Sequence, residues 1–120
     1  MGSTMKTWLG ILAISLVAAA PAVAHPALVK ATPAAKSAVA SPAVISVQFN
    51  EGLEAKFSSF DVIAADGRKI ATAPVTLDSS KKTLSAAPAS PLAAGSYKVA
   101  WRVVASDGHK VEGAYDFTVK

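Results

Sequence analysis

Residues 96–105 read SYKVAWRVVA, and this stretch decides the fold class. Large apolar side chains stand at every second position, at Tyr97, Val99, Trp101 and Val103, with lysine, alanine and arginine between them. Such alternation is typical of a β-strand with one buried face, because successive side chains of a strand point to opposite sides. We therefore expect a strand here, with Trp101 in the core.

Similar runs of β-branched and aromatic residues lie on both sides of this stretch, and no helical repeat of useful length occurs. Residues 44–50 alternate as well, with Ile45, Val47 and Phe49 on one face. Pro, Gly, Asp and Ser separate the runs, as they do between strands. The predicted strands are Ala27–Ala31, Val44–Asn50, Ser58–Ala65, Lys69–Ala73, Thr83–Ala86, Ser96–Ala105 and Gly113–Val119. About seven short strands predict an all-β sandwich or small barrel.

Several segments between the predicted strands have local signals of their own. An Asp-Gly pair at residues 66–67 is typical of a tight hairpin turn. The alanine-rich segments Ala34–Ala40 and Ala86–Ala94, interspersed with Ser and Pro, indicate loops. Residues 92–97 resemble the tyrosine corner of immunoglobulin-like sandwiches, in which a Tyr hydroxyl bonds to upstream backbone. We expect Tyr97 to be structural rather than catalytic.

The first 24 residues have the features of a cleavable export signal. Lys6 supplies a positive start, Trp8–Ala20 is apolar, and Ala22-Val23-Ala24 offers the small residues that signal peptidase accepts. The apolar run is shorter than the roughly 20 residues of a membrane span. We therefore expect residues 1–24 to be removed, leaving an exported chain of residues 25–120, which is long enough for one domain. An uncleaved N-terminal anchor remains the alternative.

The composition excludes several classes of protein. The chain has no cysteine, so disulfides, thiolate metal sites, a cysteine nucleophile and a blue-copper centre are excluded. The formal net charge is +4, but the lysines are spread along the chain rather than gathered in one stripe. We expect no nucleic-acid binding, at most a peripheral contact with a membrane, and a monomer.

Cleavage before His25 would give this residue two nitrogens to offer one metal ion, its α-amine and its imidazole Nδ1. Pro26 has no N–H to lose, so the copper-binding mode that uses successive deprotonated amides is blocked. The amine has a reference pKa of about 8, and a strongly binding ion displaces its proton at neutral pH. His25 is therefore a candidate metal ligand.

His109 is the second histidine of the chain, and it follows Asp107-Gly108 just after the strand that contains Trp101. A turn there can bring Asp107 and His109 to one side. Two imidazoles, an amine and a carboxylate form a mixed N,O set that favours Cu(II) over Zn(II). A surface histidine beside an ordinary Asp-Gly turn remains the alternative for this pair.

Five segments of the chain, taken together, resemble the CopC family of periplasmic copper-binding proteins. They are His25-Pro26-Ala27-Leu28-Val29, Thr32-Pro33-Ala34, Phe49-Asn50-Glu51-Gly52-Leu53, Leu92 to Tyr97, and Trp101 to His109. The resemblance runs from His25 to Lys120. It implies an immunoglobulin-like Greek-key β-sandwich or barrel with one Cu(II) ion at one end.

The resemblance also implies roles for individual residues. His25 would supply amine and imidazole, His109 a second imidazole, and Asp107 an axial or weaker oxygen. Glu51 matches an acidic residue beside the copper, where a carboxylate is an auxiliary ligand or orients the N-terminus; a solvated strand-end Glu remains the alternative. The best-known members carry a methionine-rich loop for Cu(I), whereas this chain has methionine only at positions 1 and 5. The resemblance therefore implies a member that binds Cu(II) only, one ion per chain.

We expect a binding protein and not an enzyme, namely a carrier in copper homeostasis, resistance or uptake. An inner-membrane copper transporter of the CopD type is a candidate partner. One alternative is a copper oxygenase with a histidine brace, but the chain is short for that class and a carboxylate near the metal would occupy room that oxygen activation needs. The other is a metal-free immunoglobulin-like adhesion or assembly module, for which His25 would be incidental.

Overall fold

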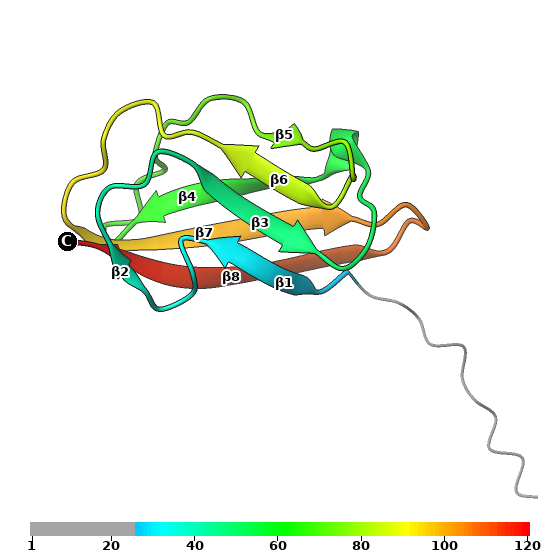
Figure 1. The fold of residues 1–120 in the computed structure, drawn as a ribbon, viewed down its shortest axis with the longest axis horizontal. Coiled ribbons are helices and arrows are strands. Elements are labelled where there is room, and N and C mark those ends of the chain that lie inside the picture. Colours follow the sequence, from blue (N-terminus) through cyan, green and yellow to red (C-terminus); the bar gives the residue numbers. More distant parts are fainter. Residues whose placement is uncertain (1–25) are drawn as a thin grey trace, which may run out of the picture.

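The alternating runs form two β-sheets that stack face to face (Figure 1). The structure is a computed structural model, and it describes residues 26–120. Its elements are β1 (Leu28–Thr32), β2 (Ala38–Val39), β3 (Ile45–Phe49), the 3-10 helix η1 (Ala55–Phe57), β4 (Ser59–Ala64), β5 (Thr76–Leu77), β6 (Thr83–Ala86), β7 (Gly95–Val104) and β8 (Lys110–Val119). One sheet has the strand order β1-β3-β6-β5 and the other β2-β8-β7-β4. The prediction of an all-β, immunoglobulin-like sandwich is confirmed.

The core lies between the sheets and consists of the inward side chains of the strands. Ile45, Val47 and Phe49 on β3 are buried, as their alternation predicts, and so are Val99 and Val103 on β7. Burying one such side chain contributes about 1.5–3 kcal/mol. Since the chain has no cysteine, this packing holds the two sheets together.

Trp101 packs against the core, although its indole stays partly exposed. Its ring makes an edge contact with Phe49 at a centroid distance of 5.9 Å and lies 6.2 Å from the ring of Tyr115. Because Phe49 and Trp101 belong to different sheets, this contact joins the sheets at the end where β3 finishes. Trp101 therefore lies on the predicted face and packs against the core, but it is only partly buried.

The predicted strand at Lys69–Ala73 is wrong. The segment makes two isolated bridges, one from Lys69 to Ile63 on β4 and one from Thr72 to Pro88 after β6. β4 and β6 belong to different sheets. The segment therefore passes from the edge of one sheet to the edge of the other, and such a crossing leaves no room for a continuous ladder.

Two short strands have no counterpart among the predicted ones. Ala38–Val39 lies in a predicted loop but forms β2, which pairs in parallel with the end of β8. Thr76–Leu77 forms β5, antiparallel to β6. The remaining predicted strands are confirmed, with their ends displaced by at most three residues.

The predicted corner and turn are both present. The Tyr97 hydroxyl donates to the carbonyl oxygen of Ala93 at 2.6 Å, which is the bond of a tyrosine corner. Gly67 has a φ of +86°, and the N–H of Arg68 donates to Asp66 Oδ1 at 2.9 Å, so the Asp-Gly pair makes a tight turn. Within residues 26–120, no helix has the length and hydropathy that crossing a membrane requires.

Candidate metal centre

The candidate site lies at one end of the sandwich, at the right in Figure 1, where three segments meet. They are the chain that leads into β1, the turn after β3, and the turn between β7 and β8. β1 and β3 belong to one sheet, whereas β7 and β8 belong to the other. His25 lies outside the described residues, and its neighbour Pro26 is buried.

Asn50, the residue after β3, binds the chain that leads into β1. The backbone N–H of Ala27 donates to Asn50 Oδ1 at 2.8 Å, and the N–H of Asn50 donates to the carbonyl oxygen of Ala27 at 3.0 Å. These two bonds extend the β1–β3 ladder by one position beyond the Leu28–Phe49 pair. Ala27 is therefore fixed against the turn that follows β3.

The turn after β3 is also bound to the turn between β7 and β8. Ser106 donates its N–H to the carbonyl oxygen of Gly52 at 3.0 Å, and Glu54 donates its N–H to the carbonyl oxygen of Val104 at 2.8 Å. A Cβ on Gly52 would lie 3.1 Å from Ser106 Oγ, so the glycine permits this close approach. Residues 50–54 thus connect the other two segments.

Asp107 and His109 form one hydrogen-bonded unit in the β7–β8 turn. The N–H of His109 donates to Asp107 Oδ1 at 3.1 Å, and His109 Nδ1 lies 2.9 Å from Asp107 Oδ2. Gly108 between them has a φ of +93°, which glycine adopts without strain. Hydrogen bonds from the backbone and then the side chain of His109 lower the pKa of Asp107. Asp107 thereby engages the Nδ1 side of the His109 ring and orients the imidazole.

A shallow hollow lies between the turns. Its lining residues are Asn50, Glu51, Gly52, Lys82, Ser106 and Asp107. Glu51 and Asp107, one from each turn, therefore both line the hollow, and Glu51 is partly buried. No local sequence signal indicates Lys82, because it comes from the β5–β6 turn and reaches the hollow only through tertiary pairing. Its carbonyl oxygen accepts the N–H of Phe49 at 2.8 Å.

The described residues supply only part of a metal-ligand set. Within residues 26–120, no three His, Asp or Glu side chains form a group that could hold a metal ion. The structure brings Asp107 against His109 and places Glu51 and Asp107 around one hollow. One imidazole with neighbouring carboxylates is a donor set that suits Cu(II) or Zn(II) once further nitrogens complete it.

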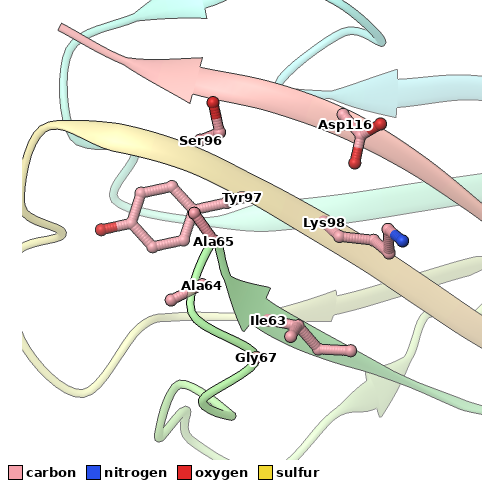
Figure 2. A pocket seen from close by; sticks show the side chains of 8 residues that line it. All are labelled: Ile63, Ala64, Ala65, Gly67, Ser96, Tyr97, Lys98 and Asp116. Atoms are coloured by element: carbon pink, nitrogen blue, oxygen red, sulfur yellow. The ribbon is translucent and has the colours of Figure 1, made fainter.

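A second hollow lies at the opposite end of the sandwich (Figure 2). It is lined by Ile63, Ala64, Ala65, Gly67, Ser96, Tyr97, Lys98 and Asp116. Lys98 and Asp116 are cross-strand partners on β7 and β8, and the Tyr97 hydroxyl already donates to Ala93. With one carboxylate and no histidine, this hollow has no donor set for a metal ion.

Known proteins resemble the chain in both sequence and fold. A family model described as the CopC domain matches residues 28–120. The chain is 38% identical to copper resistance protein C of Pseudomonas syringae pv. tomato over 92% of each chain. The crystal structure of PcoC, a methionine-rich copper resistance protein from Escherichia coli, matches with a TM-score of 0.73 and 39% identity over 81% of this chain and 100% of PcoC. That of CopC from Methylosinus trichosporium OB3b matches with a TM-score of 0.73 and 39% identity over 80% of this chain and 94% of that one.

Proposed function

The chain belongs to the CopC family, and from this membership we propose that it is an exported copper-binding protein that carries one Cu(II) ion in the periplasm. In this proposal the mature chain begins at His25, whose α-amine and imidazole bind the ion together with the imidazole of His109. Asp107 orients His109 or adds a weak axial oxygen, and Glu51 is an auxiliary group beside the ion.

One observation carries the proposal: residues 50–54 join the chain leading into β1 to the turn that bears His109. Asn50 binds Ala27, and Gly52 binds Ser106. Covalent geometry keeps the α-carbon of residue 25 within about 7 Å of that of Ala27. Nitrogen donors at position 25 are therefore tethered to the end of the sandwich that holds His109.

We propose a carrier rather than an enzyme. Two of the similar proteins are named for copper resistance, and a carrier needs an ion site without a substrate cleft. PcoC is described as methionine-rich, whereas this chain has methionine only at positions 1 and 5, so we assign it no thioether site for Cu(I). A monomer that exchanges copper with an inner-membrane transporter of the CopD type fits this assignment.

A competition titration of Cu(II) into the chain beginning at His25 tests the proposal. Trp101, the single tryptophan of residues 25–120, reports binding through its fluorescence. We expect tight one-to-one binding, and a large loss of affinity in a chain with one extra residue before His25, because the extension removes the α-amine from the chelate.

His109→Ala serves as the second arm of this experiment. It removes the imidazole but leaves the N-terminal chelate, so we expect an intermediate affinity. Weak binding by the unextended chain, or equal binding by the extended one, would contradict the proposal. The metal-free adhesion module would then be the better interpretation.

A further inference from the structure

The side chain of Asn50 accepts a hydrogen bond that a backbone carbonyl oxygen usually accepts in a β-sheet. In an antiparallel pair, two opposite residues exchange N–H···O bonds through their backbones. Here the N–H of Asn50 donates to Ala27 in the ordinary way, but the return bond from Ala27 ends on Asn50 Oδ1. The carbonyl oxygen of Asn50 is thus not needed for the ladder, and the chain can turn toward Glu51 and Gly52 while Ala27 stays bound.

This pair of bonds is exposed, so it contributes little to the stability of the sandwich. Its effect on the position of the chain is larger. Pro26 is buried and has a φ fixed near −65°, and Ala27 is held at both of its backbone polar groups. Residue 25 is therefore joined to a segment that has little freedom left.

We propose that Asn50 is a positioning residue for copper binding: its carboxamide holds Ala27 so that the amine and imidazole of His25 are presented toward His109. This inference rests on the proposed function. A donor group that is already in place does not have to be ordered when the ion binds. The entropic cost of that ordering is avoided, so the affinity for the ion is higher.

Three variants of the chain beginning at His25 test the role of Asn50, with Cu(II) alone as the probe. Asn50→Ala removes the acceptor, and Asn50→Gln displaces it by one methylene. We expect both to raise the Kd for Cu(II), roughly 3- to 10-fold for alanine, which is the range that the loss of one exposed hydrogen bond can supply. Asn50→Asp keeps an acceptor oxygen and should restore the affinity.

A further readout separates positioning from a general loss of stability. Amide hydrogen exchange at Ala27 should quicken in Asn50→Ala and stay slow in Asn50→Asp.

Ser41→Ala is the matched control, because Ser41 Oγ also accepts a backbone N–H from a distant segment, that of Leu92 at 2.8 Å. Its copper affinity should equal that of the wild type. If Asn50→Ala and Asn50→Gln bind copper within about twofold of the wild type, Asn50 has no positioning role. If the wild type itself binds weakly in the same series, the proposed function fails, and this inference fails with it.

Discussion

Gly113 and Trp101 are cross-strand partners in the β7–β8 register, and the indole lies where a side chain of residue 113 would be. A Cβ on Gly113 would lie 2.3 Å from Cζ2 of Trp101 and 2.6 Å from Cε2. Both distances are shorter than van der Waals contact permits. The place of Trp101 against the core therefore depends on a glycine at position 113.

Gly113→Ala should lower the free energy of unfolding by about 1–3 kcal/mol, which is the usual range for overpacking. Trp101 and β8 must move apart to accept the new methyl group. Urea denaturation followed by circular dichroism measures the effect. Ala114→Ser, at the exposed next position, is the control and should stay within about 0.5 kcal/mol.

The smaller ring of Trp101→Phe should relieve this overlap. The double variant is then less destabilised than the sum of the two single variants. Strict additivity of the two changes would show that the contact between the indole and Gly113 does not limit stability.

Tyr97→Phe and Tyr115→Phe remove the same atom from two buried rings and should have different effects. The Tyr97 hydroxyl donates to Ala93 at 2.6 Å, whereas that of Tyr115 has no hydrogen-bond partner within residues 26–120. We expect Tyr97→Phe to lower the free energy of unfolding by about 1 kcal/mol. Tyr115→Phe should leave it unchanged or raise it. Equal losses in thermal unfolding would contradict the assigned bond.

Burial raises the pKa of Tyr115 to about 12, from 10.0 for an exposed tyrosine. The unfolded chain therefore releases this proton first as the pH rises, and the folded chain retains it longer. Stability contributed by Tyr115 is fully present below about pH 10 and is lost between about pH 10 and 12. Between neutral pH and about pH 11, the urea midpoint of unfolding should fall further for the wild type than for Tyr115→Phe. Parallel curves would show that Tyr115 is not responsible.

Two Asp-Gly turns with the same local geometry allow a matched test of Asp107. In residues 66–68 and 107–109 the carboxylate accepts the N–H two residues ahead, at 2.9 and 3.1 Å, across a glycine with positive φ. Only the second turn ends in a histidine and contacts residues 50–54. Asp107→Asn should raise the Kd for Cu(II) roughly 10- to 100-fold, because the charged acceptor of His109 Nδ1 is lost.

Asp66→Asn is the control for this change and should leave the copper titration unaltered. The stability of the metal-free protein should be little changed in both variants, since both turns are exposed. A similar loss of affinity in both variants would mean that Asp107 acts only through the turn and not through His109.

The strands that could be predicted from the sequence are those whose pattern is local. The alternation of Ile45, Val47 and Phe49 decides which face of β3 is buried, whichever strand pairs with it. β2 has only two residues and is a strand because the end of β8 lies beside it. Residues 69–73 have the composition of a strand but cross between sheets. In both cases the neighbouring strand decides whether the segment is a strand, and the local sequence does not indicate which segments will be neighbours.

The candidate site also has one part that could be predicted from local sequence and one part that could not. The unit of Asp107 and His109 follows from the turn chemistry of neighbouring residues, which the sequence displays. Lys82 at the hollow and the bonds between Asn50 and Ala27 depend on how distant segments meet, so no local pattern indicates them. His25 lies outside the described residues, and its binding of copper stays a prediction.

The two sides of the candidate site belong to different sheets, and no disulfide joins them, because the chain has no cysteine. An ion held by His25 and His109 would bridge the two sheets. Because such an ion binds only the folded form, it would stabilise that form by mass action. Bound copper would then hold the two sheets together only while it is present. Its release would expose the carrier to proteases and shorten its lifetime.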